Sequence, residues 1–406
     1  MKILMVNKFL YPNGGSETYM LNLSEYLKKS GNEVEFFGMD SKERCVSNRI
    51  NCYTDNVDLR QAGLKDMLAY SIKSVYSSEA AKKIGKVIDA FKPDVVHLNN
   101  INFQLTPSII YEIKKHNIPI VQTVHDVQIA CPNHMMYIEH TQSICQKCLS
   151  GKYINCVKNK CIHNSTLKSI SAAVESYYYH KRNTYNLVDL YICPSKFMAN
   201  AIENGGVEKK RITVLPNYCE KQDFSKLTEN NKKYVLYFGR LSVEKGIKTL
   251  VECAKHLPDI NFIFAGTGPL EHECDGIANI SAVGFKSGNE LKSLIANASF
   301  TVCPSEWYEN CPMSIIESLS LATPVVASDL GGSKELIKEN ITGLIFEAGN
   351  VEKLTQTVSS LYYNDELISK MSSKCVENNT DAIDAYAEKL IKIYQNLILK
   401  ERKNNG

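Results

Sequence analysis

The chain has 406 residues, 44% of them hydrophobic and 22% charged, with a formal net charge of +3; this composition is typical of a globular protein long enough for two domains. No apolar run approaches the roughly 18–20 residues that a membrane-spanning helix needs, and Lys8 interrupts the apolar N-terminal stretch, which argues against a spanning helix and a signal peptide. We therefore expect a cytoplasmic protein, whose membrane contact would be peripheral, at the inner face.

The predicted elements of the first half alternate between strands and helices. A strand at 2–6 leads through a Gly-bearing loop into an amphipathic helix that starts near Ser16 and ends at Gly31, and a strand begins at Val34. Further apolar strands are predicted at 94–99, 120–126, 190–195 and 212–217. Short, continuous apolar strands between helices indicate a parallel sheet covered on both faces.

The same pattern restarts in the second half. Strands are predicted at 234–239, 261–266, 280–285, 299–305, 323–329 and 343–347. The polar segment between the two series places a boundary after residue 217, because domain linkers are polar and irregular. The sequence therefore predicts a first domain at 1–217, a second at 218–381, and a C-terminal helix within 382–406 that packs back on the first domain.

Three segments carry chemistry. Gly14 and Gly15 precede a predicted helix, so the backbone can approach a ligand and the helix N-terminus can hold an anion; a simple turn explains them equally well. Arg240 and Lys245 lie on a loop after a strand, where two cations and a helix N-terminus suit a diphosphate. Seven residues separate Glu309 from a second glutamate, on a predicted helix.

In these three segments the sequence resembles family 4 glycosyltransferases, and the resemblance covers nearly the whole chain. It implies the GT-B architecture, an α/β fold of two doubly wound, Rossmann-like domains with their strand ends around one cleft. It also implies that the first domain binds the acceptor and the second the nucleotide sugar. The residues that the resemblance assigns to the donor are Gly14, Gly15, Glu17, Asn310, Cys311, Pro312, Met313 and Glu317.

The same resemblance implies roles in the reaction. Arg240 and Lys245 would clamp the pyrophosphate, and Glu309 would face the transferred sugar. Glu317 would bind the ribose. Relatives often have Phe-Gly where this chain has Asn310-Cys311, so the sugar contact is expected to differ. His125 would contact sugar and acceptor as part of the catalytic group, and His97 and Asp126 would lie on the acceptor side.

The resulting prediction is a retaining glycosyltransferase that moves a hexose-type sugar from a nucleotide diphosphate sugar to a glycan or lipid-linked acceptor in cell-surface polysaccharide synthesis. The sequence contains no D-x-D pair, which metal-dependent transferases use to chelate Mg²⁺ or Mn²⁺, so no catalytic cofactor is expected. No nucleic-acid partner is expected. A nucleotide-sugar 2-epimerase and a non-catalytic nucleotide-sugar or glycan binder remain open alternatives.

A Cys-rich insertion at 131–165 departs from the family pattern. Cys145, Cys148, Cys156 and Cys161 have nearly the spacing of a structural zinc site, and four free thiols are the alternative. Lysines surround these cysteines, and the first half of the chain carries the excess of basic residues. This excess of basic residues suggests contact with an anionic membrane, and a solvated hairpin is the alternative interpretation of the insertion.

Overall fold

The computed structural model describes residues 1–55, 75–102, 104–220, 222–226, 233–377 and 381–405. The chain divides into two compact units. Unit 1 comprises Met1–Leu215 together with Ile383–Gly406, and unit 2 comprises Pro216–Ala382. None of the helices within the described residues combines the length and the hydropathy needed to cross a bilayer.

Unit 1 is built on a parallel six-stranded sheet with the order β2-β1-β3-β4-β7-β8. The central strands are continuously buried because helices cover both faces, as the apolar strand pattern predicts. The strands are β1 (Lys2–Val6), β2 (Glu33–Phe37), β3 (Val95–Leu98), β4 (Ile120–Thr123), β7 (Leu190–Cys193) and β8 (Ile212–Val214).

The helices of unit 1 begin at recognisable capping residues. The hydroxyl of Ser77 accepts from the backbone N–H of Ala80 at the start of α3, and Ser195 does the same for Met198 at the start of α7. The helices are α1 (Gly15–Lys29), α3 (Ser78–Phe91), α4 (Ser108–Lys115), α5 (Ile154–Lys158), α6 (Thr166–Lys181), α7 (Lys196–Asn204) and α14 (Ile383–Asn405).

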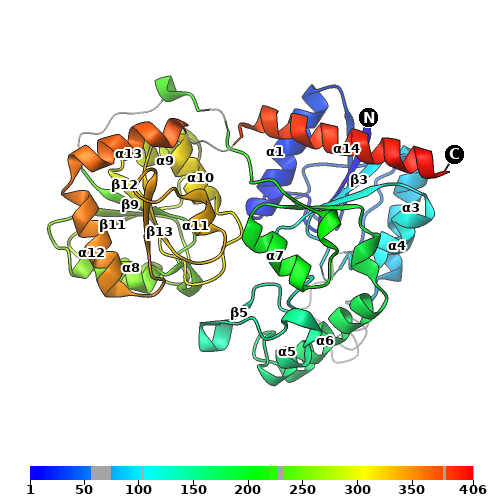
Figure 1. Ribbon diagram of the computed structural model, residues 1–406, viewed down its shortest axis with the longest axis horizontal. Coiled ribbons are helices and arrows are strands. Elements are labelled where there is room, and N and C mark those ends of the chain that lie inside the picture. Colours follow the sequence, from blue (N-terminus) through cyan, green and yellow to red (C-terminus); the bar gives the residue numbers. More distant parts are fainter. Residues whose placement is uncertain (56–74, 103, 221, 227–232, 378–380, 406) are drawn as a thin grey trace. The chain divides into compact units, whose positions relative to one another are not determined.

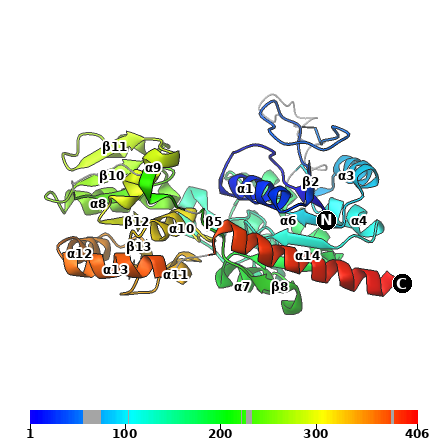
Figure 2. The same cartoon turned by 90° about the horizontal axis from the view of Figure 1, so that it is seen from above.

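The C-terminal helix α14 belongs to unit 1 and lies beside α1 (Figures 1 and 2). The hydroxyl groups of Tyr19 in α1 and Tyr386 in α14 are 2.6 Å apart, and both residues are buried. Tyr394, further along α14, reaches His97 of β3 with its hydroxyl group 2.5 Å from Nδ1. Buried polar contacts thus fix α14 to the sheet of unit 1.

Unit 2 repeats the design with a second parallel sheet in the order β11-β10-β9-β12-β13-β14. Its strands are β9 (Val235–Phe238), β10 (Phe262–Ala265), β11 (Ile280–Gly284), β12 (Phe300–Cys303), β13 (Val325–Ser328) and β14 (Gly343–Phe346). Its helices are α8 (Ile247–Lys255), α9 (Gly288–Ala296), α10 (Met313–Ser320), α11 (Ser333–Leu336), α12 (Val351–Tyr362) and α13 (Asp365–Glu377). The predicted fold class, two doubly wound parallel sheets, is confirmed.

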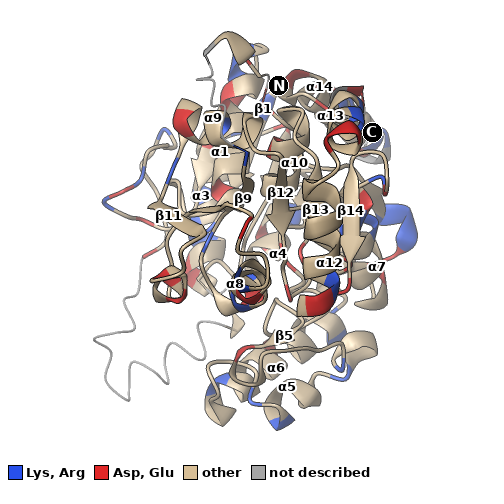
Figure 3. Cartoon of the chain, turned by 90° about the vertical axis from the view of Figure 1, so that its left-hand side faces the viewer, with Lys and Arg blue, Asp and Glu red and all other residues tan. Residues whose placement is uncertain are grey.

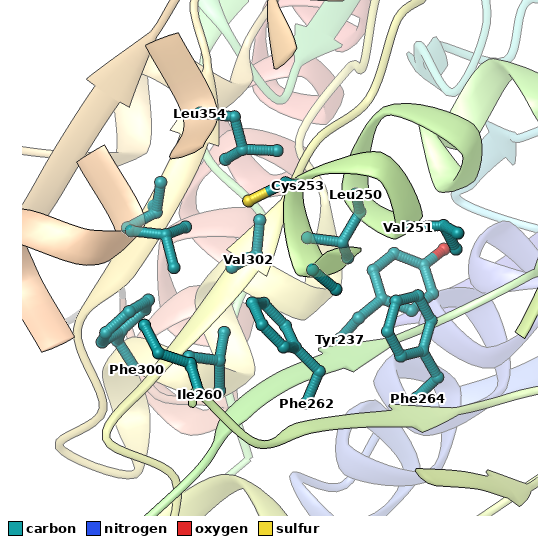
Figure 4. Packing of buried hydrophobic residues seen from close by; sticks show 14 of the residues in the cluster. Tyr237, Leu250, Val251, Cys253, Ile260, Phe262, Phe264, Phe300, Val302 and Leu354 are labelled. Atoms are coloured by element: carbon teal, nitrogen blue, oxygen red, sulfur yellow. The ribbon is translucent and has the colours of Figure 1, made fainter. Parts of the chain in front are cut away.

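One core of unit 2 lies between the sheet and the helices α8 and α12 (Figure 4). Phe262 of β10, Val302 of β12 and Leu250 of α8 are all buried in it. The rings of Tyr237 and Phe264, on neighbouring strands, have centroids 5.7 Å apart. This packing holds β9 and β12 side by side, and their carboxyl ends carry the site described next.

Candidate active site

The cationic loop of unit 2 follows β9 and lies between two glycines. Gly239 (φ +144°) and Gly246 (φ +71°) adopt backbone angles that other residues rarely reach. A Cβ atom on Gly246 would lie 1.9 Å from the carbonyl oxygen of Pro304, so only glycine lets the loop approach the end of β12 this closely. Arg240 is exposed on the loop, whereas the side chain of Lys245 is only 27% exposed.

A buried ion pair joins this loop to the segment after β12. Lys245 Nζ lies 2.6 Å from Glu309 Oε1, and the Glu309 side chain is 9% exposed. The same oxygen accepts hydrogen bonds from the Ser305 hydroxyl group (2.7 Å) and the Trp307 indole N–H (2.9 Å). Lys245 Nζ also lies 5.2 Å from the centroid of the Trp307 ring, a cation–π distance.

Both members of this pair are charged at neutral pH. Burial by itself would lower the pKa of Lys245, but the adjacent Glu309 carboxylate raises that pKa above its ordinary value. Burial by itself would raise the pKa of Glu309, but the attraction of Lys245 and the hydrogen bonds from Lys245, Ser305 and Trp307 bring it below the ordinary value. A fixed positive and a fixed negative charge therefore lie in contact at the strand ends.

The backbone around Glu309 is held as firmly as its side chain. The Gly332 N–H donates to the Glu309 carbonyl oxygen at 2.7 Å, and a Cβ atom on Gly331 (φ +60°) would lie 2.4 Å from that oxygen. The side chain of Cys311 is buried, and its carbonyl oxygen accepts from the Asn217 side-chain amide at 3.3 Å. A sugar contact from position 311 would therefore come from the backbone and not from the thiol.

Helix α10 follows directly, with Pro312 as its N-cap and Met313 as its first residue, and Glu317 lies on it. Burial and the nearby Glu220 raise the pKa of Glu317 to about 7, against the opposing effect of Lys292. Lys292 and Glu220 form an ion pair of 3.1 Å. Glu317 can therefore change its protonation state near neutral pH, unlike Glu309.

In unit 1, Glu17 is anchored at the start of α1. Gly14 is the N-cap of this helix and Gly15 its first residue. The buried Glu17 carboxylate accepts from the side-chain amide of Asn7 at 3.0 Å, and Asn7 directly follows β1. A Cβ atom on Gly14 would lie 3.3 Å from Glu17 Oε2, so the loop backbone packs against the carboxylate. The Gly-Gly loop is therefore tied to the carboxyl end of β1.

His125 follows β4 and is positioned by Asn99. Its Nε2 lies 2.9 Å from Asn99 Oδ1, while the Asn99 amide nitrogen donates to the carbonyl oxygen of Val6 at 3.4 Å. This orientation of the amide assigns the proton to Nε2 and leaves Nδ1 as an acceptor. Burial lowers the pKa of His125 to about 4, and the Tyr19 ring packs edge-on at 5.0 Å. His125 is therefore a neutral imidazole that can accept a hydrogen bond from a hydroxyl group.

Asp126 lies next to His125 and is held by two donors. The backbone N–H of Gln128 donates to Oδ1 at 2.9 Å, and the Asn102 side-chain amide donates to Oδ2 at 3.1 Å. Lys8, after β1, lies near both Asp126 and Glu17: burial lowers the pKa of Lys8, although the two carboxylates act to raise it. Lys8 and Asp126 thus lie after the carboxyl ends of β1 and β4, and the carboxylates of Asp126 and Glu17 both act electrostatically on Lys8.

The family of the chain follows from its match to two family models. Residues 13–220 match the model described as Glycosyltransferase Family 4, and residues 219–382 match the one described as Glycosyl transferases group 1. This chain belongs to glycosyltransferase family 4. The predicted identity as a glycosyltransferase is confirmed.

Relatives and solved structures agree with this family. An uncharacterised glycosyltransferase of Methanocaldococcus jannaschii, MJ1607, is 24% identical over 361 residues, which cover 85% of this chain and 84% of the relative. A second, MJ1178, is 28% identical over 212 residues, covering 51% of this chain and 58% of the relative.

The fold matches HepE of Anabaena in complex with UDP, with a TM-score of 0.69 and 17% identity over 98% of this chain and 100% of that one. It also matches sucrose-phosphate synthase of Thermosynechococcus elongatus, with a TM-score of 0.70 and 14% identity over 98% of this chain and 99% of that one. These likenesses establish the GT-B architecture of the transferase.

The structure places His97 inside unit 1 of this glycosyltransferase. The side chain is fully buried, with Nε2 2.8 Å from the Thr123 hydroxyl group and Nδ1 in contact with Tyr394. Burial and the neighbouring His125 lower the pKa of His97 to about 3. Both ring nitrogens are engaged inside unit 1, so His97 supports the packing of β3 against β4 and α14, and its place on the acceptor side stays a prediction.

Two residues of the candidate site, Lys8 and Trp307, were not identified from the sequence. Lys8 was interpreted only as an interruption of an apolar stretch. Its place two residues after the first strand, where ligands bind in parallel sheets, is a signal that could have indicated a site residue. Trp307, the only tryptophan of the chain, lies two residues before Glu309, and its indole could have been considered as a donor to that carboxylate. Its contact with Lys245 depends on the approach of two loops that the sequence does not predict.

The predicted zinc site is not supported. No group of three or more His, Cys, Asp or Glu side chains in the described chain is arranged to hold a metal ion. Cys148, Cys156 and Cys161 are instead buried in an apolar cluster with Tyr153, and Cys145 packs against it. Burial raises the pKa of Cys148 to about 12, so the thiol remains protonated and packs as a small apolar group.

Proposed function

We propose that this glycosyltransferase is retaining and metal-independent, and that it moves a hexose-type sugar from a nucleoside diphosphate sugar to a glycan or lipid-linked acceptor in cell-surface polysaccharide synthesis. The observation that carries the proposal is the position of Arg240 and of the Lys245–Glu309 pair at the carboxyl ends of β9 and β12. Ligands bind at this edge of parallel sheets, and cations there suit a departing diphosphate.

Unit 2 is the proposed donor domain. Arg240 and Lys245 contact the diphosphate, Glu309 accepts from hydroxyl groups of the transferred sugar, and Glu317 accepts from the ribose. The backbone from Asn310 to Met313, together with the Gly14–Glu17 loop of unit 1, completes the donor contacts. HepE, which shares the fold, is described in complexes with UDP and UDP-glucose, which favours a nucleotide sugar as the donor.

The proposed reaction breaks the bond between the anomeric carbon and the diphosphate oxygen, and the electron pair leaves with the diphosphate. Arg240 and Lys245 stabilise the charge that develops on it. The acceptor hydroxyl oxygen bonds to the same face of the anomeric carbon, and its proton passes to the departing diphosphate. His125, with Nδ1 free to accept, orients a hydroxyl group, and Asp126 lies on the acceptor side.

A screen of nucleotide sugars in buffer containing EDTA tests the proposal. The purified chain should hydrolyse one donor slowly without an acceptor and release the nucleoside diphosphate. Arg240→Ala should slow this release about tenfold to a hundredfold. Lys255→Ala, at an exposed lysine at the end of α8, is the matched control and should release the nucleotide as the wild type does. A 2-epimer of the donor would indicate the epimerase alternative. Binding without any turnover would indicate a non-catalytic binder, and either result would overturn the proposal.

A further inference from the structure

Helix α6 exposes an apolar stripe to solvent. Leu167, Ile170, Val174 and Tyr177 are 60%, 43%, 49% and 44% exposed. Their spacing of three, four and three residues places them on one face of the helix. Ile154 of α5 is 49% exposed and extends the stripe, since its backbone N–H donates to the Tyr177 hydroxyl group at 3.2 Å. We call these five residues the α5–α6 stripe.

The other face of α6 is already used for packing. Ser169, Ala173 and Tyr179 are buried on that face, and Ala173 belongs to the apolar cluster that contains the cysteines. The stripe is therefore a second apolar face of a helix whose own core contacts are complete. A contiguous exposed apolar surface of this kind marks an interaction site more often than isolated exposed residues do.

The charge around the stripe has one sign. Between residues 140 and 182 the only acidic residue is Glu175, which is buried. Lys and Arg colour the ribbon around α5 and α6 in Figure 3. The exposed basic residues of this segment are Lys147, Lys152, Lys158, Lys160, Lys168, Lys181 and Arg182.

We propose that the α5–α6 stripe and its surrounding basic residues dock this enzyme on an anionic lipid bilayer. Apolar side chains on one helix face enter the boundary between headgroups and acyl chains, and lysines around them meet anionic headgroups. A second copy of the chain fits the surface poorly, because a two-fold interface would bring the same basic residues against each other. The inference rests on the proposed function only for the idea that the acceptor is lipid-linked.

The docking surface is connected to the acceptor side of unit 1 through α6. Glu175, on the same helix, accepts from the Gln128 side-chain amide at 3.3 Å, and the Gln128 backbone N–H donates to Asp126. A bilayer bound by α6 would therefore lie on an element that contacts the segment holding Asp126. This connection suits an acceptor whose sugar or phosphate group extends from the membrane surface.

Flotation of the full chain with vesicles tests the apolar part of the surface. Wild-type protein should float with vesicles of phosphatidylcholine and phosphatidylglycerol, and should remain at the bottom with phosphatidylcholine alone. Ile170→Glu combined with Val174→Glu should abolish flotation. Leu399→Glu, at an equally exposed position of α14 in the same unit, should float as the wild type does. Flotation of the double variant at the wild-type level would overturn the proposal.

Substitution of the surrounding lysines tests the electrostatic contribution to membrane binding and leaves the apolar residues of the stripe unchanged. Lys152→Gln, Lys168→Gln and Lys181→Gln together should weaken partitioning roughly a hundredfold, since each basic residue near an anionic surface contributes about fivefold. The same change at exposed lysines elsewhere in unit 1 is the control, at Lys29, Lys42 and Lys82. Equal loss in both triple variants would show that only net charge matters and would overturn the assigned surface.

Two further readouts separate this inference from the proposed function. Slow donor hydrolysis should be unchanged in the stripe variant, because Ile170 and Val174 are not among the residues proposed to bind the donor. Wild-type protein that floats but hydrolyses no nucleotide sugar would refute the proposed function and leave the docking surface standing. A dimer in light scattering that the stripe variant abolishes, with no flotation of the wild type, would instead identify a second copy as the occupant and overturn the proposal.

Discussion

Replacing Lys245 with methionine should destabilise unit 2 because it leaves the buried Glu309 carboxylate without its cationic partner. The two groups lie 2.6 Å apart, and their side chains are 27% and 9% exposed. Removing one partner of a buried pair costs about 3–5 kcal/mol. Ser305 and Trp307 still donate to the carboxylate, and Lys245 is partly solvated, so we expect about 2–3 kcal/mol.

Urea unfolding followed by tryptophan fluorescence measures this loss. Trp307 is the only tryptophan in the chain and belongs to unit 2, so its emission reports the unfolding of that unit. With a denaturant slope of about 2–3 kcal/mol per molar, the urea midpoint should fall by about 1 M.

A second variant separates the charge from the packing. Lys245→Met combined with Glu309→Gln removes both charges, and the neutral amide oxygen can still accept from Ser305 and Trp307. This double variant should recover most of the lost stability. A single variant with the wild-type midpoint, or a double variant no more stable than the single one, would refute the reasoning.

Three further predictions concern other charged groups. Arg240→Ala should change the free energy of unfolding by less than about 0.5 kcal/mol, because the residue is exposed. The kcat measured by nucleotide release should nevertheless fall about tenfold to a hundredfold. A large loss of stability in the variant would contradict this prediction. If ionised Glu317 accepts from the ribose, the affinity for the nucleoside diphosphate, measured by calorimetry, should be highest above the raised pKa of about 7 and fall below it. Glu317→Gln should abolish that pH dependence. An unchanged pH dependence in the variant would count against the ribose contact. Burial raises the pKa of Glu175 to about 8, so the folded state keeps a proton that the unfolded state releases above its ordinary pKa of about 4.5. The contribution of Glu175 to stability should therefore be fully present below about pH 4.5 and fall by about 4–5 kcal/mol as the pH rises to about 8. Glu175→Gln should remove this part of the pH dependence in unfolding followed by circular dichroism, and parallel pH profiles of variant and wild type would contradict it.

The strands could be predicted from the sequence because parallel strands covered on both faces are continuous apolar runs. The segments predicted at 94–99 and 234–239 contain β3 and β9 with only their end residues lost. Their order in the sheet could not be predicted from these runs alone. The contact between Lys245 and Glu309 depends on that order, since it requires β9 and β12 to be neighbours although the two residues are 64 positions apart in the sequence.

Burial was the other quantity that the sequence did not supply. His97 and His125 both follow or end apolar strands, and only the structure distinguishes the enclosed ring of His97 from the half-buried ring of His125. The cysteine spacing resembled a metal site, but apolar packing accounts for three of the four thiols. Conversely, the helical spacing of Leu167 and Ile170 is typical of a core face, yet both are exposed.

The anomeric configuration of the transferred sugar tests the central claim most directly. Proton NMR of the first product formed from the active nucleotide sugar, in buffer containing EDTA, resolves the anomeric proton. We expect the same configuration at the anomeric carbon as in the donor, and about tenfold to a hundredfold slower product formation by the Arg240→Ala variant. An inverted anomer, or transfer that occurs only after Mg²⁺ or Mn²⁺ is added, would contradict it.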